Sequence, residues 1–205
     1  PRCDSSENAD DVAMPAAHRR PTARRQTVKV PGLVLGIDPG LQRTGYALVL
    51  PREGPHEPRL LEAGVIRLRP QQPLAERLAE LQVGLQSLMR TFRPAALACE
   101  ELYAHYRHPR TAILMGHARG VVLLQAARAG LEIIPLAATH VKKLLTGSGR
   151  ATKRQVQLAV TATFNLPTVP EPDDVADALA IALSGVRFRE AHAATAVVKR
   201  RRIVP

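Results

Sequence analysis

Four carboxylates stand out because each lies beside or within a run of apolar residues. Asp38 and Glu100 each follow a short apolar run, and Asp174 and Asp177 lie three residues apart in a segment rich in Ala, Val, Ile and Leu. A carboxylate in such surroundings is costly unless an opposite charge or hydrogen bonds neutralise it. Oxygen ligands of this kind suit Mg²⁺ or Mn²⁺ and do not suit zinc. The four acids therefore predict a site for a divalent metal ion.

The rest of the chain is basic. Its 205 residues include 29 Lys and Arg against 18 Asp and Glu, which gives a formal net charge of +11. No acidic residue occurs between Glu132 and Glu171, and that window contains Lys142, Lys143, Arg150, Lys153 and Arg154. A local excess of positive charge is typical of a surface that binds nucleic acid, although it also serves solubility. Acids in one place and cations in another predict a metal ion presented to a polyanion.

Buried strands and amphipathic helices must position these residues. Apolar runs bounded by Pro and Gly predict strands over 33–38, 44–50, 59–68, 95–100 and 131–136. Spacing of three and four between apolar residues predicts helices over 73–92, 111–129, 139–145, 152–164 and 173–186. Three successive antiparallel strands, followed by strands that alternate with helices, predict an α/β fold with a mixed sheet and helices on both of its faces.

The pattern predicts one domain over residues 31–186. We expect residues 1–30 to be a disordered basic leader outside the fold and 187–205 to be a flexible basic tail, because the tail shows no apolar periodicity. Cys3 and Cys99 cannot form a disulfide framework, and no apolar run reaches the length of a membrane span. These features fit a protein of the reducing cytoplasm that is not bound to a membrane.

Each acid also has a simpler interpretation. Asp38 precedes a Pro-Gly turn and could be an ordinary turn aspartate, and Glu101 competes with Glu100 for the end of its strand. Asp174 could cap the N-terminus of its helix. Asp177 is harder to dismiss because it interrupts an otherwise apolar helix. Spacing of three places it on the same helix face as Asp174.

Several short motifs, taken together, are far more specific than any one acid. They are Gly36-Ile-Asp-Pro-Gly40 with Thr44-Gly45, Cys99-Glu100-Glu101, Gly116-His-Ala-Arg-Gly120, Val141-Lys142, Leu145-Thr-Gly-Ser-Gly-Arg-Ala-Thr-Lys153 and Asp174-Val-Ala-Asp-Ala-Leu-Ala180. In this order the chain resembles the RuvC family of Holliday-junction resolvases, in register from about residue 33 to 184. The resemblance covers roughly three quarters of the chain and leaves both ends outside it.

The resemblance implies a ribonuclease H-like fold and a homodimeric, magnesium-dependent endodeoxyribonuclease that acts on four-way DNA junctions in recombination and repair. It implies that the four acids are catalytic and bind two Mg²⁺ ions per site, with Mn²⁺ as a substitute, and that the nicks carry 5′-phosphate and 3′-hydroxyl ends. The helix over 111–129 resembles the family's dimerisation helix, although its apolar residues would equally suit a core helix. Whether a branch-migration complex of RuvA- and RuvB-like proteins is a partner stays open.

The basic residues take their expected roles from the same resemblance and from their charge. Lys142 and Lys153 match catalytic cations beside the cleaved strand, where they would offset phosphate charge in the transition state, and each could instead lie on a solvated helix face. Tyr103 matches an aromatic residue that stacks on a base, or is part of the core. The remaining cations of the acid-free window, Lys143, Arg150 and Arg154, are expected DNA contacts.

Two other function classes compete with a nuclease. Phosphotransferases of the sugar-kinase and actin type also begin with a strand, an acid and a Gly-rich turn, but they need a second phosphate loop and a longer, two-lobed chain. A nucleic-acid-binding module of the same fold without catalytic activity is the other alternative. Such a module would be expected to have lost at least one acid, whereas all four are present. The sequence therefore favours the nuclease.

Overall fold

The computed structural model describes residues 30–51, 58–102 and 109–201, so most of the predicted leader, Tyr103 and the last four residues lie outside it. The described elements are, in order, β1 (Val34–Asp38), β2 (Arg43–Leu50), β3 (Arg59–Arg67), α1 (Leu74–Phe92), β4 (Ala96–Glu100), α2 (Pro109–Arg128), β5 (Glu132–Leu136), α3 (Ala138–Thr146), α4 (Lys153–Thr163) and α5 (Asp173–Arg201). All five predicted strands and the starts of all five predicted helices lie within two residues of these bounds.

The strands form one mixed sheet in the order β3-β2-β1-β4-β5. β1 pairs antiparallel with β2, which pairs antiparallel with β3, whereas β4 is parallel to both β1 and β5. Asp38 lies opposite Gly45 on β2, and Ile37 lies opposite Cys99 on β4. The predicted mixed sheet is confirmed, and the two strands that end in acids are neighbours.

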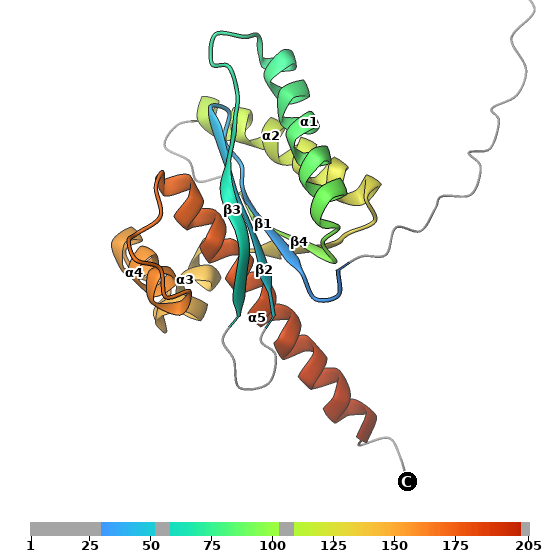
Figure 1. Ribbon diagram of the computed structural model, residues 1–205, viewed down its shortest axis with the longest axis vertical. Coiled ribbons are helices and arrows are strands. Elements are labelled where there is room, and N and C mark those ends of the chain that lie inside the picture. The colour runs from blue at the N-terminus through green and yellow to red at the C-terminus, as the bar shows by residue number, and fades with distance from the viewer. Residues whose placement is uncertain (1–29, 52–57, 103–108, 202–205) are drawn as a thin grey trace, which may run out of the picture.

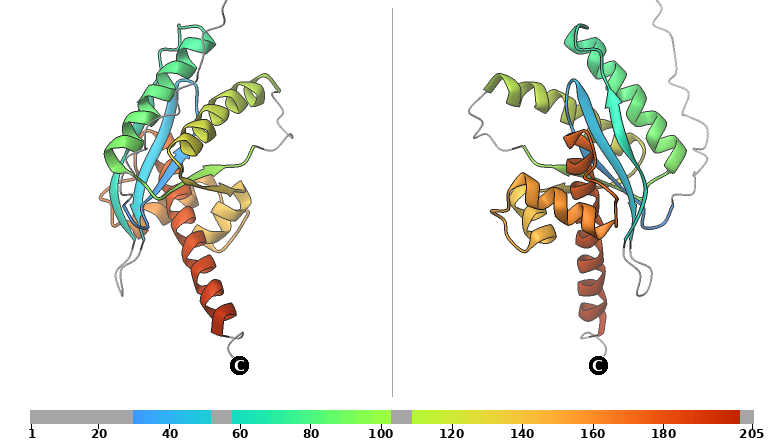
Figure 2. Two further views of the ribbon diagram at one scale, coloured as in Figure 1. Left: turned by 90° about the vertical axis from the view of Figure 1, so that its right-hand side faces the viewer. Right: turned by 60° about the vertical axis from the view of Figure 1, so that its left-hand side comes forward.

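Helices cover both faces of the sheet (Figures 1 and 2). α1 and α2 lie on one face, and α3, α4 and α5 lie on the other. Side chains of a strand alternate between the faces, so β1 contributes to two cores. Leu35 and Ile37 pack with residues of α1 and α2, whereas Val34 packs with residues of α5. The even-numbered residues of β1 therefore point to the α5 side.

Turn and cap residues set where the functional segments begin. The Thr44 hydroxyl donates to the Gly40 carbonyl at 2.7 Å and accepts from the Gly40 N–H at 3.2 Å, which closes the turn after Asp38. Thr152 and Gln155 form a capping box, with the Gln155 N–H donating to the Thr152 hydroxyl at 3.3 Å. The box fixes Lys153 as the first residue of α4.

α5 approaches the sheet so closely that three positions require glycine. A Cβ atom at Gly36 would lie 2.4 Å from the Ala182 nitrogen, and one at Gly45 would lie 1.9 Å from the Asp174 oxygen. At Gly185, a Cβ atom would lie 2.7 Å from the Cβ of Ala98. Because real Cβ contacts are not this short, the helix and the strands touch through their backbones.

The predicted end of the last helix is wrong. Instead of stopping at residue 186, α5 continues to Arg201, so at least residues 187–201 of the predicted flexible tail are helical, and α5 projects beyond the sheet (Figure 1). This stretch is rich in Ala and Arg, which favour helix even where no apolar face guides the prediction. Within the described part of the chain, no helix combines the length and apolar character needed to cross a bilayer.

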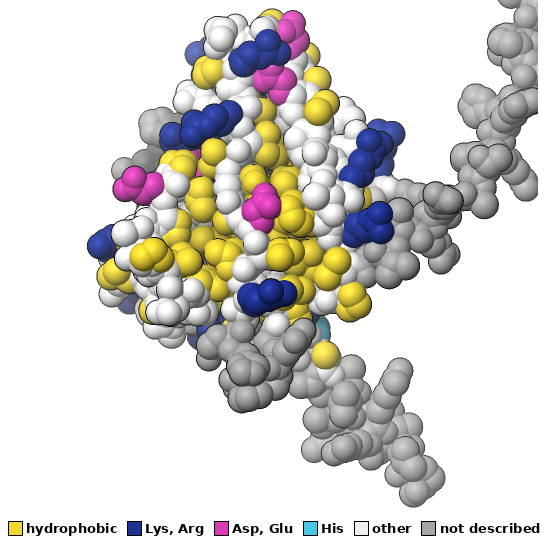
Figure 3. All heavy atoms as spheres, in the orientation of Figure 1, with side chains coloured by type: hydrophobic (Ala, Val, Ile, Leu, Met, Phe, Trp, Pro, Cys, Tyr) yellow, Lys and Arg dark blue, Asp and Glu magenta, His cyan; other side chains and the backbone are white. Residues whose placement is uncertain are grey.

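β3 is one of the two edge strands of the sheet, and among the described strands it is the one without a fully buried residue. No residue of β3 is fully buried, and Leu61 is 43% exposed. On the face shown in Figure 3, hydrophobic side chains gather over the centre of the molecule, and Lys and Arg side chains lie mainly around its margin. β3 carries no acid of the predicted site, since Asp38 and Glu100 are the last residues of β1 and β4 and the other two acids belong to α5.

Candidate metal centre and active site

Strand geometry places the two strand acids side by side. Asp38 is the last residue of β1 and Glu100 the last of β4, and the two strands are parallel neighbours. Asp38 lies two residues after Gly36, and Glu100 lies two residues after Ala98, both of which contact α5. Residues two apart on a strand point to the same face. Both carboxylates therefore lie at the carboxyl edge of the sheet, on its α5 side.

The first turns of α5 bring the helical acids to the same place. Asp174 and Asp177 are three residues apart, so they share one helix face, and their side chains are 24% and 33% exposed. The Asp174 carbonyl lies against Gly45, which pairs with Asp38 across the strands. The charges of Asp177, Glu100 and Asp174 all act on the Asp38 carboxyl. The structure thus brings the four predicted acids together.

Burial and mutual repulsion make this cluster unfavourable when all its members are ionised. Burial, reinforced by the charges of Asp177, Glu100 and Asp174, raises the pKa of Asp38 to about 7, and only Lys153 opposes this. Burial also raises the pKa of Glu100, with a further rise from Asp177 and an opposing effect of Lys142. The pKa of Asp177 is raised by burial against the opposing effect of Lys153. The cluster requires positive charge.

Part of that charge comes from side chains of the protein itself. Lys153 Nζ lies 3.0 Å from Asp177 Oδ2 and 3.0 Å from Asp173 Oδ2. Arg43 Nε lies 3.1 Å from Asp174 Oδ2. Burial tends to lower the pKa of Lys153, but its hydrogen bonds to Asp177 and Asp173 outweigh this and raise it. The ammonium of Lys153 is therefore firmly charged, and it lies at the edge of the acid cluster.

The chemistry of the donor set fits a hard divalent cation. Its donors are carboxylate oxygens only, they carry mutually repelling charges, and three of them have raised pKa values because of burial. As the side chains stand, no three His, Cys, Asp or Glu residues of the described segments converge closely enough to hold one ion. Lys153 and Arg43 occupy Asp177 and Asp174 instead. An ion bound through these same carboxylate oxygens would compete with the two cations.

Three residues at the site were not predicted. Asp173 accepts hydrogen bonds from Lys153 and, at 3.0 Å, from Gln157 Nε2 of α4, so it joins α5 to α4. Arg43 pairs with Asp174. Arg119 of α2 donates to the Glu100 carbonyl at 2.9 Å and holds the end of β4. Arg119 belongs to one of the motifs described above, which could have singled it out, whereas the partner of Arg43 depends on how α5 packs.

Not every predicted cation reaches the acids. Lys142 acts on Glu100 and Lys153 on Asp177, so the structure brings both to the site. All three other cations are exposed: Lys143 lies on α3, Arg150 on the segment between α3 and α4, and Arg154 on α4. Among the described residues none of these three has an ion pair with the four acids. Their expected role as DNA contacts stays a prediction.

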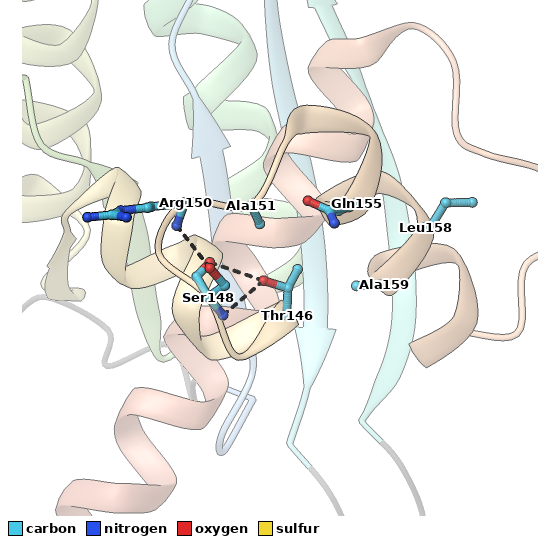
Figure 4. Close-up of a pocket in the computed structure, with 7 residues that line it drawn as sticks. All are labelled: Thr146, Ser148, Arg150, Ala151, Gln155, Leu158 and Ala159. Atoms are coloured by element: carbon cyan, nitrogen blue, oxygen red, sulfur yellow. Dashed lines mark hydrogen bonds between the residues drawn. The ribbon is translucent and has the colours of Figure 1, made fainter.

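A hollow of about 470 Å³ lies where α3 meets α4 (Figure 4). It is lined by Thr146, Ser148, Arg150, Ala151, Gln155, Leu158 and Ala159. The Thr146 hydroxyl donates to the Ser148 carbonyl at 3.1 Å, and the Arg150 N–H donates to the Ser148 hydroxyl at 3.3 Å. None of the four acids lines it, so this hollow is not the metal centre.

The region that carries the four acids matches known proteins over its whole length. Residues 34–185 match the family model described as crossover junction endodeoxyribonuclease RuvC. The RuvC of Rhodopirellula baltica is 55% identical over 152 residues, which are 74% of this chain and 84% of that protein. The RuvC of Pelotomaculum thermopropionicum is 43% identical over 151 residues, covering 74% of this chain and 90% of that one.

The chain is also similar to solved structures of Holliday junction resolvases. The chain is similar to Thermus thermophilus RuvC in complex with a Holliday junction substrate, with 36% sequence identity, a TM-score of 0.71, and coverage of 78% of this chain and 96% of that chain. The yeast mitochondrial Holliday junction resolvase Ydc2, at 16% identity and a TM-score of 0.57, shares the fold. The predicted ribonuclease H-like fold is confirmed. The matching family model, the identity to its relatives and the shared fold together show that this chain belongs to the RuvC family.

Proposed function

We propose that the chain is a structure-selective endodeoxyribonuclease that resolves four-way DNA junctions by paired, metal-dependent nicks. It would act in the cytoplasm, in homologous recombination and DNA repair. The observation that carries this proposal is the convergence of Asp38, Glu100, Asp174 and Asp177 at one edge of the sheet. A module without catalytic activity would have no reason to keep four clustered carboxylates, three of which have their pKa raised by burial.

The four acids would hold two Mg²⁺ ions, and Mn²⁺ could replace them. Bound there, the metal would supply Lewis-acid activation of water and of the scissile phosphate. Lys142 and Lys153 lie beside the acids, and they would offset charge on the phosphate as the bond breaks. Attack of water on phosphorus with departure of the 3′ oxygen leaves a 5′-phosphate and a 3′-hydroxyl.

The direct test compares three nucleic-acid substrates with the same purified protein. A synthetic four-way junction, a linear duplex of one of its arms and an RNA–DNA hybrid are incubated with Mg²⁺, with Mn²⁺ and with a chelator. We expect cleavage of the junction in symmetrically related strands, with ends that DNA ligase can reseal, and no cleavage in the chelator. Preferential cleavage of the hybrid would instead indicate a nuclease of another substrate class on the same fold.

Lys142 provides a test of phosphate binding on α3. We expect Lys142→Ala to slow junction cleavage by about 10- to 100-fold, because one charge that offsets the transition state is lost. Junction affinity should weaken by a similar factor for every base sequence. The slope of log affinity against log salt should fall by the equivalent of about one phosphate contact. Lys143→Ala, an expected DNA contact on the exposed part of the same helix, is the matched control: it should weaken junction binding but leave the cleavage rate of saturated enzyme unchanged. A change of base preference in Lys142→Ala would contradict a phosphate contact.

The proposed homodimer would form through the exposed face of α2. Ile113 is 61% exposed and Leu124 is 54% exposed, and a Cβ atom at Gly116 or Gly120 would meet nothing within 4 Å. These four residues lie on one side of the helix, and small residues there would allow a second helix to approach closely. Ala118, Val122 and Ala126 occupy the opposite, buried side.

A charged residue on this face should separate the dimer. We expect Leu124→Glu to lower the molar mass measured by light scattering from two chains to one at micromolar concentration, because a carboxylate would be desolvated at the interface. Paired cleavage of the junction should then be lost, although single nicks can continue. Val83→Glu is the matched control, since Val83 is 65% exposed on α1 and lies outside this face. Dissociation by Val83→Glu alone would place the interface elsewhere.

A further inference from the structure

Arg43 begins β2 beside the acid cluster and belongs to none of the motifs described above. Its Nε lies 3.1 Å from Asp174 Oδ2, and its side chain is 49% exposed, against 24% for Asp174. Gly45, two residues further on, lies opposite Asp38 and has no room for a Cβ beside the Asp174 carbonyl. The backbone at the start of β2 is thus held against α5, while the Arg43 side chain keeps access to solvent.

The pairing of Arg43 with Asp174 has a direct consequence for metal binding. A guanidinium remains charged at every working pH, so it competes for the Asp174 carboxylate under all assay conditions. A divalent ion held by Asp174 would be repelled by a guanidinium 3.1 Å from the same oxygen. The Arg43 side chain would therefore have to leave Asp174 when an ion arrives, and it is sufficiently exposed to do so.

We propose that Arg43 exchanges partners during the reaction: it neutralises Asp174 before the metal ion binds, and it then binds a phosphate of the junction DNA next to the cleaved bond. This rests on the proposed function of the site. The planar guanidinium presents paired donors that match phosphate as well as carboxylate. Since Arg43 lies on the same edge as Asp38 and Asp174, a phosphate held at the metal centre would come within its reach.

The first half of the exchange is measured without DNA. Mn²⁺ or Mg²⁺ is titrated into wild-type protein and into Arg43→Gln by calorimetry, and we expect Arg43→Gln to bind the ion about 2- to 5-fold more tightly because an exposed ion pair no longer competes. Arg67→Gln is the matched control, since Arg67 lies opposite Arg43 on β3 and has no ion pair with a described acid. Unchanged or weaker ion binding by Arg43→Gln would overturn the proposal.

The second half is measured with DNA in a Glu100→Gln background, which prevents cleavage and leaves Asp174 in place. With saturating Mg²⁺, Arg43→Gln should weaken junction binding by about 3- to 10-fold and lower the slope of log affinity against log salt by about 0.9, the loss of one phosphate contact. Arg43→Lys should retain most of the salt slope because it keeps the charge. In chelator, with Arg43 held on Asp174, the effect of Arg43→Gln should be much smaller. Equal effects in Mg²⁺ and in chelator, or no change of slope in either, would overturn the exchange.

The two measurements separate this proposal from the function on which it rests. If wild-type protein cuts the junction but Arg43→Gln leaves ion affinity or salt slope unchanged, the junction nuclease stands and the exchange is wrong. If wild-type protein binds a four-way junction no better than a linear duplex, the proposed function fails. The ion titration then still reports whether Arg43 competes for Asp174, although its phosphate partner would be ruled out.

Discussion

Replacement of Asp38 by Asn should reduce cleavage of a four-way junction by at least about 1,000-fold. Asp38 lies at the centre of the acid cluster, and a metal ion held there would stabilise transition-state charge by several kcal/mol, of which each 1.4 kcal/mol or so corresponds to a factor of ten. Glu100→Gln and Asp177→Asn should have effects of similar size because each would remove a proposed ligand. Initial rates on a labelled junction with Mg²⁺ measure the loss. Wild-type rates in any of the three would contradict the metal centre.

Binding and a neighbouring acid supply the controls for that result. Each of the three variants removes negative charge near DNA phosphates, so junction affinity should be retained or increase. Glu101→Gln is the matched control, since Glu101 follows directly in the sequence and its N–H pairs with the Leu136 carbonyl of β5. It should cleave at close to the wild-type rate. Loss of activity in Glu101→Gln but not in Glu100→Gln would mean that Glu101, and not Glu100, is the metal ligand.

In a metal-free buffer, Asp38→Asn should make the protein more stable, in contrast to its effect on activity. Burial and the charges of Asp177, Glu100 and Asp174 raise the pKa of Asp38 from 3.8 to about 7. A difference of about three pH units corresponds to at most about 4 kcal/mol of free energy. We expect the free energy of unfolding at pH 8 in chelator to rise by about 1–3 kcal/mol in Asp38→Asn, as measured by urea denaturation.

The size of this stability gain depends on pH. Because the folded state raises the pKa of Asp38, its carboxyl costs nothing below about pH 4, where folded and unfolded chains both hold the proton. The cost grows as the pH rises towards 7 and is constant above it. The advantage of Asp38→Asn should therefore disappear by pH 4. Glu76→Gln, an exposed acid in the first turn of α1, should show no such gain, and a similar gain there would point to net charge as the cause.

Addition of a divalent ion extends the same comparison. Mg²⁺ or Mn²⁺ that binds the folded state alone should raise the melting temperature of the wild-type protein in proportion to the logarithm of its concentration. In Asp38→Asn this rise should be much smaller, while its starting value in chelator is higher. An equal rise in both proteins would mean that the ion binds outside the acid cluster.

The sequence predicts the elements of the fold well because local signals mark their ends. Pro39 and Gly40 stop β1, and Gly130 ends α2 in the left-handed conformation, with φ of 64°. The end of α5 was mispredicted because residues 187–201 have no apolar periodicity. Their Ala- and Arg-rich composition favours helix through backbone propensity, which a search for buried faces does not detect.

The candidate site was predicted only in part, for a similar physical reason. Strand ends and helix spacing are local, so all four acids could be proposed from the sequence: Asp38 and Glu100 at strand ends, and Asp174 and Asp177 on one helix face. The pairing of Arg43 with Asp174, and of Lys153 with Asp173, depends on how α4 and β2 meet the start of α5. Such contacts join residues more than a hundred positions apart in one case, and no local pattern in a single sequence reports them.

The glycine contacts beneath α5 make the spacing of the acids a property of the main chain. Gly36, Gly45 and Gly185 let the helix come closer to the strands at three points than any larger side chain would permit. Substitutions elsewhere in the two cores can then loosen the protein without changing the separation between helical and strand acids. Variants should accordingly lose heat resistance long before they lose turnover at moderate temperature, and the exceptions should cluster at these three glycines.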